Sequence, residues 1–117
     1  MSKDSELAVV SIDFSIEIIR YYKWLIAEHK EYVMSKQILR SGTSIGANIH
    51  EAYYAVSKPD FISKMQIALK EASETEYWLT ILKKTGYSSP EFSILDSQCL
   101  SLKKMLISTL NTIKTKD

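Results

Sequence analysis

The sequence predicts an all-α fold, an up-down-up-down left-handed four-helix bundle that forms one domain over residues 1–117. Apolar residues recur at steps of three and four along four long segments, which is the spacing of the buried face of a helix. The chain contains only three Gly and two Pro, so it has few places to turn. Short polar links separate the segments, and such links join antiparallel neighbours in a bundle.

The first segment, from about Ser5 to His29, has a wide apolar arc. The predicted core positions on this arc are Val10, Phe14, Ile18, Tyr21, Tyr22, Leu25 and Ile26. The charged residues Asp13, Glu17, Arg20 and Lys23 gather on the other side. An arc this broad indicates that the helix is covered from two directions.

The second helix is expected from about Ser35, its predicted cap, to Val56. Pro59 then interrupts the chain, and Ser57 or Asp60 can accept hydrogen bonds from the first amides of the third helix. The third helix has a predicted core seam of Phe61, Met65, Ala68, Ala72, Thr75, Leu79 and Leu82. Gly86 supplies a left-handed stop.

The fourth helix is predicted to begin at Ser89–Glu91, where a capping serine precedes a proline at the first helical position. Its expected core seam is Phe92, Leu95, Cys99, Leu102, Leu106, Leu110 and Ile113. Cys99 is the single cysteine, so it has no internal disulfide partner, and its apolar neighbours predict a buried, reduced thiol. This composition fits a cytoplasmic protein, and we expect neither an export signal nor a membrane span.

The stretch Arg40–Glu51 is unusual for a helix because it contains two glycines and several short polar side chains. A helical projection places Ile38, Gly42, Ile45, Ile49, Ala52, Tyr53 and Val56 on the core face. Gly42 and Gly46 lie side by side at the edge of this face, which favours the close approach of another helix over a kink or an exposed backbone. A phosphate-binding loop is not expected, because no Gly-Lys-Ser/Thr ending follows and no strand precedes.

A separate polar stripe on the same helix is our candidate binding or subunit-contact surface. It consists of Gln37, Arg40, Ser41, Ser44, Asn48 and Glu51. Ser and Asn compete with the helical backbone for hydrogen bonds, so solubility alone does not explain them. The stripe is either a hydrogen-bonded face between helices or subunits, an anion site gripped by Arg40, or a simply exposed face. Glu51 is expected to pair with an Arg of another helix.

Further apolar residues lie outside the predicted core and indicate self-association. The third helix carries a second stripe of Ile67, Glu74, Trp78 and Ile81, where a monomer would place polar side chains. Trp24 lies among charged residues of the first helix, as an interface anchor does. We therefore predict that Trp24 and the second stripe contact neighbouring subunits.

Several of these motifs resemble a known family. Arg40–Ser41, Ser44–Ile49 and Glu51, followed by Asp60–Ile62, Ala68–Ala72 and Glu74–Leu79, are similar to the bacterial four-helix-bundle proteins related to those encoded in 23S rRNA intervening sequences. The resemblance implies a ring-shaped homopentamer. A more distant similarity is to the accessory variability determinant of diversity-generating retroelements, a basic pentamer that binds reverse transcriptase and nucleic acid. This chain departs from that relative in its formal net charge of +1.

The sequence favours a protein that is not an enzyme and has no cofactor or metal. His50–Glu51 begins like a zinc-protease helix, but Tyr54 stands where the second histidine is needed. Two functions remain open. RNA or DNA could bind an assembled surface rich in Lys83, Lys84, Lys103, Lys104, Lys114 and Lys116. Alternatively, the oligomer is a protein-protein assembly or adaptor module that binds no nucleic acid.

Overall fold

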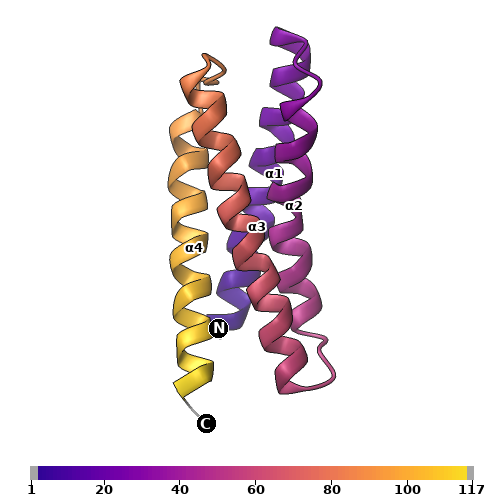
Figure 1. Ribbon diagram of the computed structural model, residues 1–117, viewed down its shortest axis with the longest axis vertical. Helices are drawn as coiled ribbons and strands as arrows, with labels where there is room; N and C mark the ends of the chain where they lie inside the picture. The colour runs from indigo at the N-terminus through magenta and orange to yellow at the C-terminus, as the bar shows by residue number, and fades with distance from the viewer. Residues whose placement is uncertain (1–2, 116–117) are drawn as a thin grey trace.

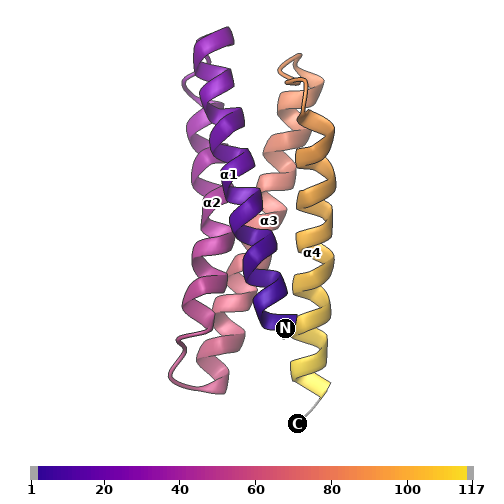
Figure 2. The same ribbon diagram turned by 180° about the vertical axis from the view of Figure 1, so that it is seen from behind.

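In the computed structural model, which describes residues 3–115, four helices pack side by side. Their bounds are Lys3–His29 for α1, Met34–Ala52 for α2, Lys58–Lys84 for α3 and Phe92–Thr115 for α4. The helices run alternately up and down (Figures 1 and 2), as predicted. Consecutive helices are in contact and α4 also contacts α1, which closes a four-helix bundle. No strand occurs in the described part of the chain.

The α1–α2 connection differs from the prediction because Ser35 does not cap α2. The Glu31 carboxylate instead accepts hydrogen bonds from the backbone N–H groups of Val33, Met34 and Ser35, at 3.2, 3.1 and 2.7 Å. Helix α1 ends just before this point because Lys30 adopts a left-handed conformation, with φ of 50°. A carboxylate at a helix N-terminus also interacts favourably with the helix dipole. Glu31 therefore starts α2 without a serine cap.

Helix α2 ends at Ala52, earlier than the predicted Val56. The N–H groups of Tyr53, Tyr54 and Ala55 each bond to the carbonyl three residues back, so the chain tightens into turns. Val56 is 93% exposed, and its assignment to the core was wrong. Ser57 is the predicted cap of α3, and its hydroxyl accepts a hydrogen bond from the Asp60 N–H at 3.2 Å.

The α3–α4 connection begins as predicted and ends slightly later. Gly86 has φ of +91°, the left-handed conformation expected of a helix stop. Pro90 lies in the turn, not at the first helical position, because α4 begins at Phe92. The Phe92 N–H bonds to the Ser89 carbonyl at 3.1 Å, which folds the turn back onto the start of the helix.

The core runs along the axis of the bundle and follows the predicted seams closely. All predicted seam positions of α3 from Met65 to Leu82 are buried, as are those of α4 from Phe92 to Leu110. The close approach predicted at the glycines is also confirmed. A Cβ added at Gly42 would lie 2.8 Å from Cγ1 of Ile18 on α1, and one at Gly46 would lie 3.2 Å from the Ser15 hydroxyl.

Candidate interaction surfaces

Arg40 is the centre of the polar stripe on α2, and it faces α3 of the same subunit. Its Nη1 lies 3.2 Å from Oε2 of Glu71, and its Nη2 forms a close ion pair with Glu74. The hydrogen bond from Arg40 lowers the pKa of Glu74, and the hydrogen bond to Glu71 raises the pKa of Arg40. The guanidinium fork is thus occupied by two carboxylates, which matches the interpretation of a hydrogen-bonded face between helices.

Ser41 does not belong to an outward surface, and its placement there was wrong. The residue is fully buried between α2 and α3. The Thr75 hydroxyl donates a hydrogen bond to its Oγ at 2.9 Å. The projection put Ser41 beside Arg40, but α3 packs closely enough to cover it. Ser41 therefore contributes to packing within the subunit.

Ser44 and Asn48 bond to their own helix. The Ser44 hydroxyl donates to the Arg40 carbonyl at 2.6 Å, and the Asn48 amide donates to the Ser44 carbonyl at 2.8 Å. Such bonds satisfy short polar side chains locally. These two side chains consequently do not present a row of donors to an anion, as the anion-site interpretation required.

The two ends of the stripe are exposed. Gln37 is exposed on the first half of α2. Glu51 pairs with Lys64 of α3 at 3.1 Å, so its predicted cationic partner is a lysine of the same subunit, not an arginine. The polar stripe is thus anchored to α3 at both Arg40 and Glu51.

The second stripe of α3 lies beside Arg40, so the structure brings the two predicted groups together. The Trp78 indole N–H donates to Oε2 of Glu74 at 3.3 Å, and Glu74 in turn pairs with Arg40. Ile67 is 39% exposed, whereas Trp78 and Ile81 are half-buried. We call this set the α2–α3 surface; it consists of Gln37, Arg40, Ile67, Glu74, Trp78 and Ile81, of which Arg40, Glu74 and Trp78 are linked by the contacts above.

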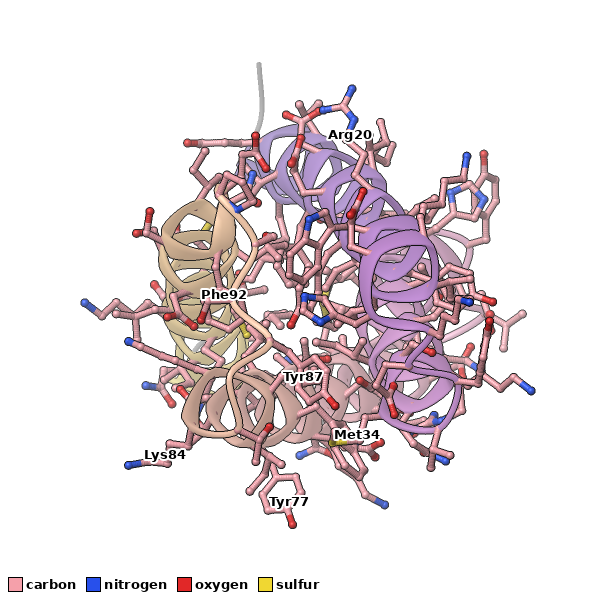
Figure 3. All side chains as sticks on the ribbon, turned by 90° about the horizontal axis from the view of Figure 1, so that it is seen from above. Arg20, Met34, Tyr77, Lys84, Tyr87 and Phe92 are labelled. Atoms are coloured by element: carbon pink, nitrogen blue, oxygen red, sulfur yellow. The ribbon has the colours of Figure 1, made fainter. Side chains whose placement is uncertain are left out.

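Trp24 packs partly within its own subunit, and its contact with a neighbouring subunit stays a prediction. It stacks on Tyr21 with a centroid distance of 6.0 Å and lies 4.6 Å from the His29 ring. Tyr21 makes an edge contact with Phe92 and donates a hydrogen bond to the Tyr87 carbonyl at 2.7 Å. Figure 3 looks down on this end of the bundle and shows Tyr87 and Phe92 beside its interior.

A third surface on α1 was missed by the sequence analysis. The side of α1 opposite the core carries large apolar residues that are between 38% and 58% exposed. They are spaced by three and four residues, and we call them the α1 face: Val9, Ile12, Ile16 and Ile19. The same spacing is visible in the sequence, but the neighbouring charged residues concealed it.

The reactive side-chain types are placed for structural roles. Cys99 is buried and its thiol lies 3.6 Å from the Ala72 carbonyl oxygen. Burial raises the pKa of Cys99 to about 12, so the thiol is not ionised at neutral pH. The ring of His50 lies beside the ring of Tyr54, with a distance of 5.3 Å between their centroids. Within the described residues no cluster of His, Cys, Asp or Glu could hold a metal ion.

Comparison with known proteins decides the family. Residues 3–108 match the family model of the 23S rRNA-intervening sequence protein. The chain belongs to this family. A crystal structure of a protein with unknown function from the S23 ribosomal protein family of Bacteroides thetaiotaomicron superposes with a TM-score of 0.90 at 50% identity. The match covers 94% of this chain and 99% of that one, so it extends well beyond the α2–α3 motifs.

The comparisons give the chain a family and a fold. No curated protein matched the chain. Among the described residues, no helix is long and apolar enough to cross a membrane. The residues that carried the family resemblance include Arg40 and Glu74, which form the ion pair between α2 and α3. At least part of the family motif therefore serves the packing of the bundle.

Proposed function

We propose that this protein is a non-enzymatic, cytoplasmic assembly module whose copies associate into a homo-oligomeric ring. The observation that carries the proposal is the α1 face, a row of four large apolar side chains that point away from the core of their own subunit. Monomeric proteins rarely expose such contiguous apolar surface without a partner. The formal net charge of +1 adds little repulsion between copies.

The partner of the α1 face is the α2–α3 surface of the next copy. Figure 1 has α3 in front of α1 and Figure 2 reverses this order, so the outer faces of these two helices point in opposite directions. Contact between two different surfaces on opposite sides of a subunit is head-to-tail, and it generates a closed ring when the rotation closes. A pentamer, which the family resemblance implies, is such a ring.

Single lysine substitutions test this arrangement. Ile16→Lys should dissociate the oligomer because it places a charge in the centre of the α1 face. Leu100→Lys is the matched control, since Leu100 is a similarly exposed apolar residue on α4. Light scattering after size exclusion would report the mass of each variant, and circular dichroism would verify folding. Equal masses for the two folded variants would contradict the proposed contact.

A mixing experiment separates head-to-tail assembly from a symmetric contact of the α1 face with itself. Ile67→Lys should also dissociate the ring, because it disrupts the α2–α3 surface. In a mixture, the intact α1 face of Ile67→Lys can bind the intact α2–α3 surface of Ile16→Lys. The mixture should form a heterodimer that cannot grow further. Persistence of monomers in that mixture would exclude the head-to-tail arrangement.

RNA or DNA binding is the second candidate function, favoured by the exposed Lys84 and Lys104 on α3 and α4. Two other lysines of the predicted basic group are paired, Lys83 with Asp96 at 3.8 Å and Lys103 with Glu76 at 3.0 Å. These pairs reduce the positive charge offered to phosphates, and assembly is therefore the function we propose first. Fluorescence anisotropy with structured RNA and duplex DNA at low salt tests the alternative. Salt-sensitive binding that Lys84→Ala weakens would favour it.

A further inference from the structure

A hollow of about 250 Å³ lies between α1 and the start of α4, apart from the α1 face and the α2–α3 surface. Its wall includes the stacked rings of Tyr21 and Trp24, and its rim carries Glu17, Arg20 and Glu91. Phe92 supports Tyr21 from behind through an edge contact at 5.5 Å. Figure 3 shows Arg20 on the outer edge of α1 at this end of the bundle.

The charges around the hollow favour a cation. Two carboxylates, Glu17 and Glu91, face one guanidinium, Arg20. Arg20 pairs with Glu17, but its side chain is 71% exposed, so the pair is weak and easily exchanged for another cation. Glu91 is exposed and has no ion pair among the described residues.

The aromatic wall favours an apolar body attached to that cation. Trp24 is half-buried, so part of its ring remains open to the hollow that it lines. Leu95 and Ile94 add aliphatic surface from α4. The volume lies below the range of about 300–1,000 Å³ that drug-sized ligands occupy, which selects a smaller molecule.

We propose that this hollow binds a small organic amine whose ammonium group lies between Glu17 and Glu91 and whose apolar group packs against Trp24. Recognition requires both halves of the ligand. A neutral molecule of the same shape lacks the charge that the two carboxylates attract, and an inorganic cation lacks the apolar body. This inference does not depend on the proposed function, because the lining residues come from one subunit.

Tryptophan fluorescence tests the proposal with benzylamine, which is positively charged at neutral pH. Trp24 and Trp78 are the two tryptophans, so a Trp78→Phe background reports on the hollow alone. We expect a saturable change in Trp24 fluorescence with half-saturation at about 1 mM. Benzyl alcohol, the neutral molecule of similar shape, should give no saturable change. An equal response to both molecules, or no saturation by benzylamine, would overturn the proposal.

The carboxylate assignment is tested in the same background. Glu91→Gln preserves the shape of the rim and removes one charge, so the half-saturating concentration of benzylamine should rise by about threefold. Glu51→Gln removes a carboxylate at the far end of α2 and should leave the titration unchanged. Equal titrations for the two variants would overturn the role of Glu91. Sizing of the wild-type protein, which retains Trp78, reports the assembly separately, so failure of this site and failure of the proposed assembly are distinguishable.

Discussion

Gly42 of α2 lies directly against Ile18 of α1, since a Cβ added to the glycine would come within 2.8 Å of the isoleucine Cγ1. Ile18 is fully buried and cannot move aside. A glycine within a helix costs about 1 kcal/mol relative to alanine. The close contact of the two helices explains why the sequence accepts that cost at this position.

Substitution of the two helical glycines should therefore change the free energy of unfolding by different amounts. Gly42→Ala should lower the free energy of unfolding by about 1–3 kcal/mol, because overpacking against Ile18 outweighs the gain in helix propensity. Gly46→Ala is the control; its Cβ would meet the Ser15 and Ser11 hydroxyls at 3.2 and 3.3 Å, and these groups can rotate. We expect a change within about 0.5 kcal/mol there. Urea unfolding measures both, and equal destabilisation would refute the steric explanation.

The ion pair of Arg40 with Glu74 should make stability depend on pH. Arg40→Ala is expected to cost about 0.5–1 kcal/mol at pH 7, a modest effect because Arg40 is half exposed. The folded pKa of Glu74 is lowered, so its contribution is present above the unfolded carboxylate pKa of about 4.3 and is lost as the pH falls through the folded value. The difference in free energy of unfolding between wild type and Arg40→Ala should therefore shrink as the pH falls.

Urea unfolding of wild type and Arg40→Ala at neutral and acidic pH measures this difference. Lys36→Ala is a suitable control, because Lys36 is exposed on the same helix and forms no ion pair with the described residues. Its effect should be small at both pH values. A cost of Arg40→Ala that persists unchanged in acid would argue against the ion pair as its cause.

The hydroxyl of Tyr21 holds the α3–α4 connection against α1, because it donates to the Tyr87 carbonyl at 2.7 Å. Tyr21→Phe should cost about 1 kcal/mol or slightly more, since it leaves a partly buried carbonyl without its donor. Tyr22→Phe removes a hydroxyl that forms no hydrogen bond with the described residues and should be nearly neutral. Thermal unfolding compares them, and a nearly neutral Tyr21→Phe would show that this bond contributes little.

Cys99 should resist thiol reagents while the protein is folded. Its pKa is raised to about 12 by burial, so the reactive thiolate is scarce at pH 8. The protonated thiol contributes fully to the free energy of unfolding below the unfolded pKa of about 8.5. This contribution declines as the pH rises towards 12. Reaction with DTNB at pH 8 should be slow without urea and rapid in urea. Rapid reaction in both would contradict the burial of Cys99.

The sequence predicted the bundle well because the core seams of α3 and α4 depend only on local spacing. The positions that it misjudged depend on contacts between helices. Ser41 was assigned to a polar stripe by its angle, but coverage by α3 could not be read from that angle. Ser35 was a good cap by composition, yet Glu31 reaches the same amides from the preceding loop.

The two tryptophans show the same limit. In the helical projection, Trp24 is adjacent to charged residues. Its ring neighbours Tyr21 and His29 contact Phe92 and Tyr87, which lie far along the chain, so the projection could not predict this aromatic cluster. Trp78 was correctly linked with Glu74, since both lie on one helix four residues apart. The α1 face could have been predicted from spacing alone. Its four apolar residues were not recognised because charged neighbours marked that side as solvated.

Native mass spectrometry of the wild-type protein tests the proposed assembly most directly. The subunit mass is 13.4 kDa. If the α1 face of each copy binds the α2–α3 surface of the next, the dominant species at micromolar concentration should be a single closed oligomer, with five subunits as the expected number. A dominant species with the mass of one subunit would contradict the account.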